Sequence, residues 1–175
     1  RASDPVTGEQ LTELGADVVI NPSEVIADSA LRAVESGELE HKAATLAEVI
    51  ESASDGMAIV THDNPSPDSI ASAVALQAIT SSFSVDSDII YFGEIGHQEN
   101  RAFVNLLGVE LTQAHDPATL NEYGLIALVD HSAAGGVIDH DIDIYIDHFE
   151  PEDDLAARFS DVRPNVSSTS TILTK

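Results

Sequence analysis

The sequence predicts an α/β domain, a mostly parallel β-sheet with helices on both faces. From residue 57 onward, apolar runs alternate with helical segments, which is typical of βαβ units. Three apolar runs end in Asp or His side chains, near residues 62, 130 and 148. Because parallel strands place their carboxyl ends at one edge of a sheet, we expect these polar side chains to gather there.

Three parts are predicted along the chain. Residues 1–40 contain a polar turn at Arg1, a turn followed by a short buried strand over 14–20, and a helix over 21–34 capped by Ser23. Residues 41–56 form a linker helix, since apolar residues over 40–52 keep helical spacing. The third part, residues 57–175, is expected to run in the order strand 57–62, helix 68–80, strand 88–93, helix 97–107, a short strand near 109–113, strand 125–130 and strand 143–148. The abrupt ends suggest a piece of a longer protein, with parts missing on both sides.

The composition is strongly acidic, with 31 Asp and Glu against 7 Lys and Arg and a formal net charge of -24. Such a surface repels itself, but at about 1 M salt the Debye length falls to roughly 3 Å and screens the repulsion. We therefore expect a salt-rich cytoplasm, as in a halophile. A disordered acidic protein fits poorly, because 43% of the residues are hydrophobic and form clean apolar runs.

The same composition excludes several functions. Long nucleic acids are not expected as partners, because their binding needs Lys and Arg against phosphates. The chain has no cysteine, which excludes disulfides and thiolate chemistry. No apolar run approaches the roughly 20 residues of a membrane span, so we predict a cytoplasmic protein.

The turn after the first apolar run supports two interpretations. Ser66, Pro67 and Asp68 are the residues that a helix start favours, as N-cap, first helical residue and first-turn acid. His62 lies across the same turn and could share a ligand with Asp68. Together with Asp130 and His148 at other strand ends, they form a set of carboxylate and imidazole ligands suited to Mn²⁺ or Mg²⁺. Two such ions, roughly 3.5 to 4 Å apart, would make a hydrolytic site for phosphate esters.

Residues from about 57 to 175 resemble the first domain of the DHH phosphoesterase family, which includes RecJ-like nucleases, oligoribonucleases, exopolyphosphatase-related proteins and family II pyrophosphatases. The resemblance is carried by three motifs: His62 to Asp68, Val129 to His131, and Asp147 to Phe149. The segment from Gly96 to Phe103 is also similar to the family. The order and spacing of the three motifs make the match specific.

The resemblance implies a role for each matching residue. His62 would bind one metal ion, Asp68 and His148 the second, and Asp130 would bridge the two. These four are the predicted catalytic and metal-binding residues, with Mn²⁺ or Mg²⁺ as cofactor. Predicted substrate-binding residues are Asn64, His97, Asn100 and Arg101.

Two positions depart from the family pattern. Ser66 stands where the family has a metal-binding aspartate, and Phe149 stands where it has the last histidine of its triplet. A serine replaces neither the charge nor the geometry of a carboxylate, and phenylalanine can neither donate a proton nor stabilise an oxyanion. We therefore expect an incomplete two-metal site and a weakened or lost activity. The family's fourth metal-binding aspartate and its second domain would lie beyond Lys175.

Residues 1–40 resemble the end of a TrkA-N or RCK domain, the Rossmann-like module of potassium-transport regulators, through Leu14 to Asp17 and Asn21-Pro22. No glycine-rich dinucleotide turn is present in the sequence, so no NAD or ATP site is assigned.

These observations leave three hypotheses. The first is a metal-dependent phosphoesterase acting on phosphodiester bonds of small nucleotides or short oligonucleotides. The second is a catalytically inactive, nucleotide-sensing regulator linked to a cation transporter. The third is a pure dinucleotide-binding regulator without a metal. A homodimer is a further expectation.

Overall fold

The computed structural model describes residues 5–96, 98–131, 140–151 and 155–174. The chain forms two compact units, Arg1–Ala44 and Thr45–Lys175. The first unit contains helix α1 (Pro5–Glu13) and the first part of helix α2 (Pro22–Glu51), whose last residues belong to the second unit. Among the described residues, no helix is both long enough and apolar enough to cross a membrane.

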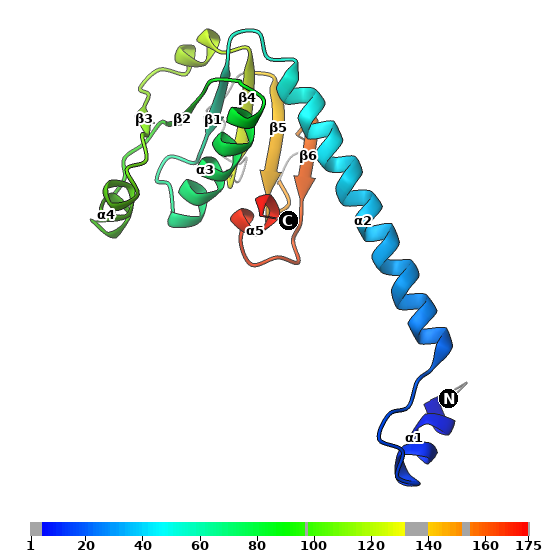
Figure 1. Ribbon diagram of the computed structural model, residues 1–175. Coiled ribbons are helices and arrows are strands. Elements are labelled where there is room, and N and C mark those ends of the chain that lie inside the picture. The colour runs from blue at the N-terminus through cyan, green and yellow to red at the C-terminus, as the bar shows by residue number, and fades with distance from the viewer. Residues whose placement is uncertain (1–4, 97, 132–139, 152–154, 175) are drawn as a thin grey trace. The chain divides into compact units, whose positions relative to one another are not determined.

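The second unit is built on a six-stranded, wholly parallel sheet (Figure 1). Its strand order is β3-β2-β1-β4-β5-β6, so β1 and β4 are neighbours although a long stretch of chain separates them. The predicted α/β class with a parallel sheet is therefore confirmed. The strands are β1 (Met57–Val60), β2 (Ser87–Tyr91), β3 (Thr112–Gln113), β4 (Leu125–Val129), β5 (Ile142–Asp147) and β6 (Ala157–Val162).

Strands β1 and β4 are buried along their whole length, which explains why they read as continuous apolar runs. Successive side chains of a strand point to opposite faces. Met57 and Ile59 accordingly pack into one hydrophobic cluster, and Ala58 and Val60 into another on the opposite face of the sheet. The sheet therefore has a core on each side, which holds the carboxyl ends of its central strands in fixed positions.

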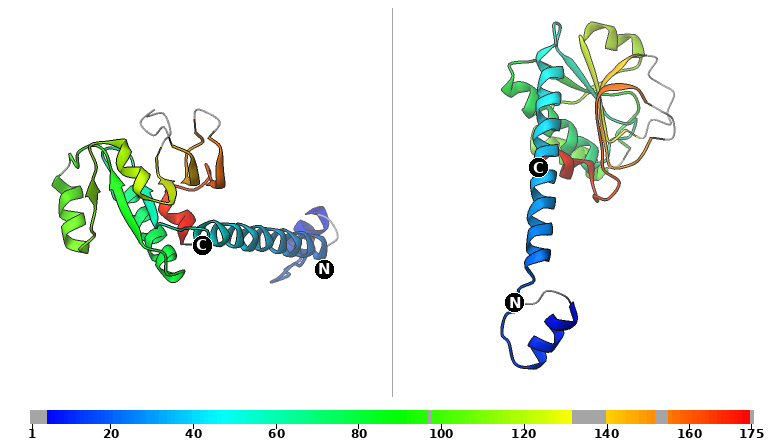
Figure 2. Two further views of the ribbon diagram at one scale, coloured as in Figure 1. Left: turned by 90° about the horizontal axis from the view of Figure 1, so that it is seen from above. Right: turned by 90° about the vertical axis from the view of Figure 1, so that its right-hand side faces the viewer.

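Different elements cover the two faces of the sheet. The end of α2, helix α3 (Pro67–Ser82) and helix α5 (Thr169–Leu173) contribute side chains to the cluster on one face. Figures 1 and 2 show where these helices lie beside the sheet. On the other face, the 3-10 helix η1 (Pro117–Glu122) contributes the fully buried Leu120. Helix α4 (Gln98–Leu107) follows β2 and contacts α3.

The start of α3 follows from its residues. Ser66 is the N-cap, with its Oγ accepting a hydrogen bond from the backbone N–H of Ser69 at 3.1 Å. Pro67 follows in the first turn, where its missing N–H costs nothing. The capping interpretation of this turn is therefore confirmed for Ser66 and Pro67.

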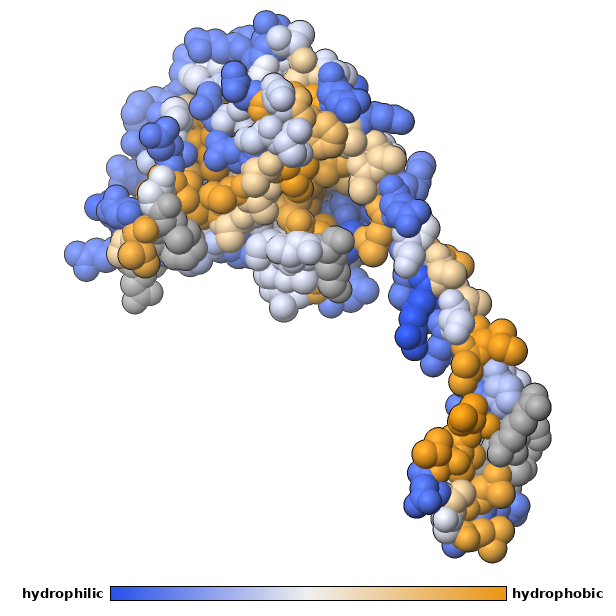
Figure 3. Space-filling model, in the orientation of Figure 1, coloured by the Kyte–Doolittle hydropathy of each residue, from blue (hydrophilic) through white to orange (hydrophobic). Residues whose placement is uncertain are grey.

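The N-terminal unit differs from the prediction. Residues 14–20 form a turn and an irregular segment instead of a buried strand, and Leu14 and Val18 are 84% and 75% exposed. Figure 3 shows apolar side chains gathered on the surface of this unit. A strand needs a pairing partner, and within the described residues all strands belong to the sheet of the second unit.

The two predicted helices over 21–34 and 40–52 are one helix, α2, which passes through Gly37 without a break. A glycine costs a helix interior only about 1 kcal/mol, and the good helix formers around it offset this. Its first turn is capped by Asn21, whose Oδ1 accepts from the N–H of Ser23 at 3.1 Å, so Ser23 is not the cap. The polar turn predicted at Arg1 lies outside the described residues, which begin with α1.

Candidate metal centre

The candidate site lies at the carboxyl edge of the sheet, where β1 and β4 meet. From β1 the chain leads to β2 on one side, and from β4 it leads to β5 on the other. Neighbouring parallel strands whose connections leave in opposite directions create a crevice, and ligands bind at such crevices in α/β proteins. His62 follows β1, Asp130 follows β4, and His148 follows β5. The predicted gathering of strand-end side chains therefore occurs.

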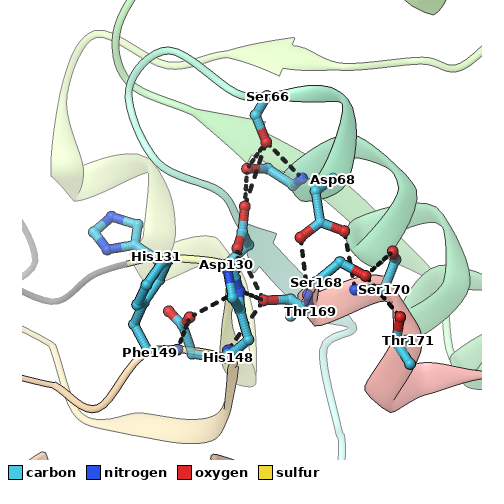
Figure 4. Close-up of polar contacts among 12 residues, drawn as sticks. Ser66, Asp68, Asp130, His131, His148, Phe149, Ser168, Thr169, Ser170 and Thr171 are labelled. Atoms are coloured by element: carbon cyan, nitrogen blue, oxygen red, sulfur yellow. Dashed lines mark hydrogen bonds and ion pairs between the residues drawn. The ribbon is translucent and has the colours of Figure 1, made fainter. Parts of the chain in front are cut away.

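Three side chains in this crevice could hold a metal ion. Asp68, Asp130 and His148 each offer one ligand atom, and these atoms all lie within 4.8 Å of one another. Two carboxylates and an imidazole suit a divalent cation such as Mn²⁺ or Mg²⁺. Figure 4 shows the three side chains converging from different elements. They border a cavity of about 370 Å³ that is also lined by His62, Ser66, Asp147, Phe149, Ser167 and Ser168.

Asp130 is the central residue of the group. Its backbone has φ 49°, in the left-handed region that aspartate and asparagine tolerate better than most residues. Its N–H donates to the carbonyl of Ile146 on β5 at 3.0 Å, which ties the strand end down. Unusual backbone conformations of this kind persist where the surrounding structure fixes them, often at functional sites.

The two carboxylate oxygens of Asp130 have different partners. Oδ1 lies 3.3 Å from Nδ1 of His148 and accepts a hydrogen bond from the hydroxyl of Thr169 at 2.9 Å. Oδ2 accepts from Ser69 Oγ at 2.5 Å and from Ser66 Oγ at 3.4 Å. Oδ1 thus contacts His148 and Thr169, and Oδ2 contacts a pair of serine hydroxyls.

Asp68 belongs to the first turn of α3, yet its carboxylate is directed to α5. Its two oxygens accept from the backbone N–H groups of Thr169 at 2.8 Å and Ser170 at 3.1 Å. This carboxylate therefore does more than favour the start of its own helix. It fixes the start of α5 at the carboxyl edge of the sheet.

His62 lines the same cavity, outside the group of three ligand atoms. Its Nδ1 accepts a hydrogen bond from the backbone N–H of Asn64 at 3.0 Å. In the neutral ring the proton then lies on Nε2, which makes that nitrogen a donor. The structure thus brings together three of the four predicted metal ligands and places the fourth beside them as a hydrogen-bond donor.

Two of the predicted substrate-binding residues, Asn64 and Asn100, brace this turn. Asn64 Oδ1 accepts from the N–H of Gly96, and Asn100 Nδ2 donates to the carbonyl of Pro65 at 3.0 Å. Arg101 Nε donates to the carbonyl of Ile95. The fourth residue predicted to bind substrate, His97, lies outside the described residues.

Several buried groups at the site escaped the sequence prediction. Asp147 is 1% exposed, and burial raises the pKa of its carboxyl, with the nearby charge of Asp130 adding to the effect. Burial also raises the pKa of Tyr145, whose hydroxyl donates to Asp147. His131 is buried, burial lowers the pKa of its imidazole, and its Nδ1 has no hydrogen-bond partner among the described residues. The Asp-His pairs at both strand ends were the available signal for Asp147 and His131.

Comparisons with known proteins agree with this fold. No family model matches the chain. An exopolyphosphatase-related protein from Bacteroides fragilis has a similar structure, with a TM-score of 0.53, over 79% of this chain and 42% of that one. The two sequences are 18% identical, so the likeness shows a shared fold.

A sequence relative is an uncharacterized protein of Methanocaldococcus jannaschii, 38% identical over 178 residues. The match covers 93% of this chain and 37% of that protein. The chain thus spans little more than a third of the curated relative that it matches.

Proposed function

We propose that this domain binds one divalent cation, Mn²⁺ or Mg²⁺, through Asp68, Asp130 and His148. We further propose that it uses the ion to hydrolyse a phosphoester bond in a small nucleotide or short oligonucleotide. The observation that carries this proposal is the convergence of the three ligand atoms within 4.8 Å at the crevice between β1 and β4. A likeness in fold to an exopolyphosphatase-related protein is consistent with it.

The contacts of Asp130 favour one ion over two. A carboxylate that bridges two cations commonly gives one oxygen to each. Here Oδ2 accepts hydrogen bonds from Ser66 and Ser69, and His62 uses Nδ1 as an acceptor. Neutral hydroxyls supply dipoles to this oxygen but cannot replace the charge of a second cation. The proposed centre would therefore hold a single ion, with Asp68, Asp130 and His148 as its ligands.

The residues that line the cavity suggest how the site would bind a phosphate group and act on it. A divalent cation, when bound, supplies Lewis-acid chemistry toward phosphoryl oxygens. Nε2–H of His62, at the border of the cavity, could donate a hydrogen bond to a phosphate oxygen. Without Asp or His in place of Ser66 and Phe149, proton transfer and charge stabilisation rest on fewer groups, and we expect slow turnover.

Phe149 supports a nucleotide as the substrate. It lines the cavity, is 59% exposed, and its ring centroid lies 4.1 Å from that of His148. An exposed aromatic ring next to a phosphate-binding centre can stack on a base, an interaction worth about 1 to 3 kcal/mol per base in proteins that bind single-stranded nucleic acids. Phe149, which cannot donate a proton, thus offers the face of its ring to a nucleobase.

The same residue favours a second candidate function, a nucleotide sensor without catalytic activity. In that case the domain would bind a nucleotide through the cation and Phe149, and pass the signal to a partner such as a cation transporter. A salt-rich cytoplasm and a homodimeric assembly remain proposals for either function.

The experiment is a cation-binding titration combined with an assay of hydrolysis. We expect calorimetry of the chain in high salt to give one Mn²⁺ per chain, lost in Asp130→Asn and kept in Glu110→Gln, a matched change at an exposed acid. Hydrolysis of bis-p-nitrophenyl phosphate or short RNA should require Mn²⁺ and fail in Asp130→Asn. Cation and nucleotide binding without hydrolysis would establish the sensor instead, and no cation binding would refute both.

A further inference from the structure

One short segment, Thr169 and Ser170 at the start of α5, contacts every residue of the proposed metal centre (Figure 4). The backbone N–H groups of both residues donate to Asp68. The hydroxyl of Thr169 contacts Asp130 and His148. Thr169 is fully buried, so its hydroxyl depends on these partners.

The hydrogen bonds of the Thr169 hydroxyl determine where the protons lie. A hydroxyl has one hydrogen to donate and can accept from two directions. Its hydrogen goes to Oδ1 of Asp130 at 2.9 Å, because an ionised carboxylate only accepts. The two remaining contacts, with the backbone N of His148 at 3.2 Å and with Nδ1 of its ring at 2.7 Å, must then both be donated to Thr169.

The imidazole of His148 therefore carries its proton on Nδ1. In the neutral ring, Nε2 is then the nitrogen with a free lone pair, which is what a cation requires of a histidine ligand. Metal-binding histidines generally donate their other ring N–H to a neighbouring acceptor, which fixes the tautomer and the ring orientation. Thr169 provides the nearer acceptor here at 2.7 Å, with Oδ1 of Asp130 at 3.3 Å from the same nitrogen, and the Thr169 hydroxyl also holds that Asp130 oxygen.

We propose that Thr169 is the positioning residue of the metal centre, one that sets the tautomer of His148 and the orientation of Asp130 without binding the ion itself. This inference rests on the proposed cation site. It assigns a role to a segment that lies 21 residues beyond His148 and 101 residues beyond Asp68. Removing the Thr169 hydroxyl should therefore weaken cation binding although all three ligands remain.

The test compares Thr169→Val with Thr169→Ser. Valine has nearly the shape of threonine and lacks the hydroxyl, whereas serine keeps the hydroxyl and loses a methyl group. We expect Thr169→Val to bind Mn²⁺ about 10- to 100-fold more weakly, as is typical when the partner of a metal-binding histidine is lost. Thr169→Ser should bind within about threefold of the unsubstituted chain. Equal Mn²⁺ affinities for the valine and unsubstituted chains would overturn the proposal.

A second measurement does not depend on how well the valine variant folds. Long-range ¹H–¹⁵N spectra of the metal-free, unsubstituted chain report which ring nitrogen of His148 carries the proton, with its signal assigned by comparison with His148→Gln. A proton on Nδ1 supports the role of Thr169, and a proton on Nε2 overturns it. If the unsubstituted chain bound no Mn²⁺, the proposed function would fail, while the tautomer would still report on Thr169 alone.

Discussion

Replacing Ser66 by Asp tests the one-ion centre most directly, because it adds a carboxylate beside the oxygen of Asp130 that now accepts from hydroxyls. Ser66 Oγ lies 3.4 Å from Asp130 Oδ2, so the two charges would be close. Two unit charges 4 Å apart interact by about 4 kcal/mol at an effective dielectric constant of 20. Both side chains are partly exposed, and with salt present we expect about 2 kcal/mol of repulsion to remain.

The other consequences of Ser66→Asp are small. Aspartate is as good an N-cap as serine, so α3 keeps its start, and a negative charge there stabilises the helix by about 0.5 kcal/mol. The metal-free variant should therefore unfold more easily by about 1 to 2 kcal/mol. In Mn²⁺ this penalty should disappear, and calorimetry should show a second ion per chain, because Asp130 could then give an oxygen to each.

The assay is urea denaturation at fixed ionic strength, with and without Mn²⁺. Ser66→Asn is the matched control, because asparagine caps a helix equally well and carries no charge. The reasoning would be refuted if the aspartate and asparagine variants were equally stable without Mn²⁺. It would also be refuted if the aspartate variant still bound a single ion.

Three further predictions concern the frame around the site. Asp130→Gly should be about 1 kcal/mol more stable than Asp130→Ala in urea denaturation, because neither variant keeps the side-chain hydrogen bonds and only glycine adopts φ near 49° freely. If the alanine variant were the more stable one, the claim that the backbone of residue 130 is strained would be wrong. Gly93→Ala should destabilise the chain by about 1 to 3 kcal/mol, since the added Cβ would overlap the carbonyl oxygen of Asp63, whereas Gly96→Ala, whose Cβ would lie 3.6 Å from Asn64, should be tolerated in the same thermal melts. Burial and a hydrogen bond to Asp88 raise the pKa of Tyr123 to about 12, which favours its neutral form in the folded chain. The stability that Tyr123 adds, measured as the difference in urea midpoint from Tyr123→Phe, should therefore be complete below pH 10 and disappear between about pH 10 and 12. A difference in midpoint that stayed constant over this pH range would contradict the prediction.

The elements that could be predicted from the sequence are those with a strong local pattern. Buried central strands such as β1 and β4 read as apolar runs, and the start of α3 has a cap and a proline. Strand β6 is absent from the prediction because it lies at the sheet edge, and because the buried Asp161 puts a carboxylate where the alternation calls for an apolar residue. Helix α5 was missed because five residues, mostly Thr and Ser, give too short a pattern.

The candidate site could likewise be predicted only in part from the sequence. Asp68, Asp130 and His148 could be chosen because each stands at a strand end or a helix start, where the parallel topology brings such residues together. Thr169 could not be chosen, because its role depends on the packing of α5 against the sheet edge. The strand predicted within 14–20 is wrong because the apolar residues of this segment resemble a buried strand, and the sequence does not show whether a second strand is there to pair with it.

The hydrogen bond between Asp68 and Thr169 joins the start of α3 to the start of α5. A cation would find its ligands correctly placed only after β4, β5 and α5 have all reached their native positions. Contacts so distant in sequence form late, because the intervening chain must be ordered first. Manganese uptake during refolding should accordingly trail the gain of secondary structure, so that the ion acts as a reporter of completed assembly instead of a template for it.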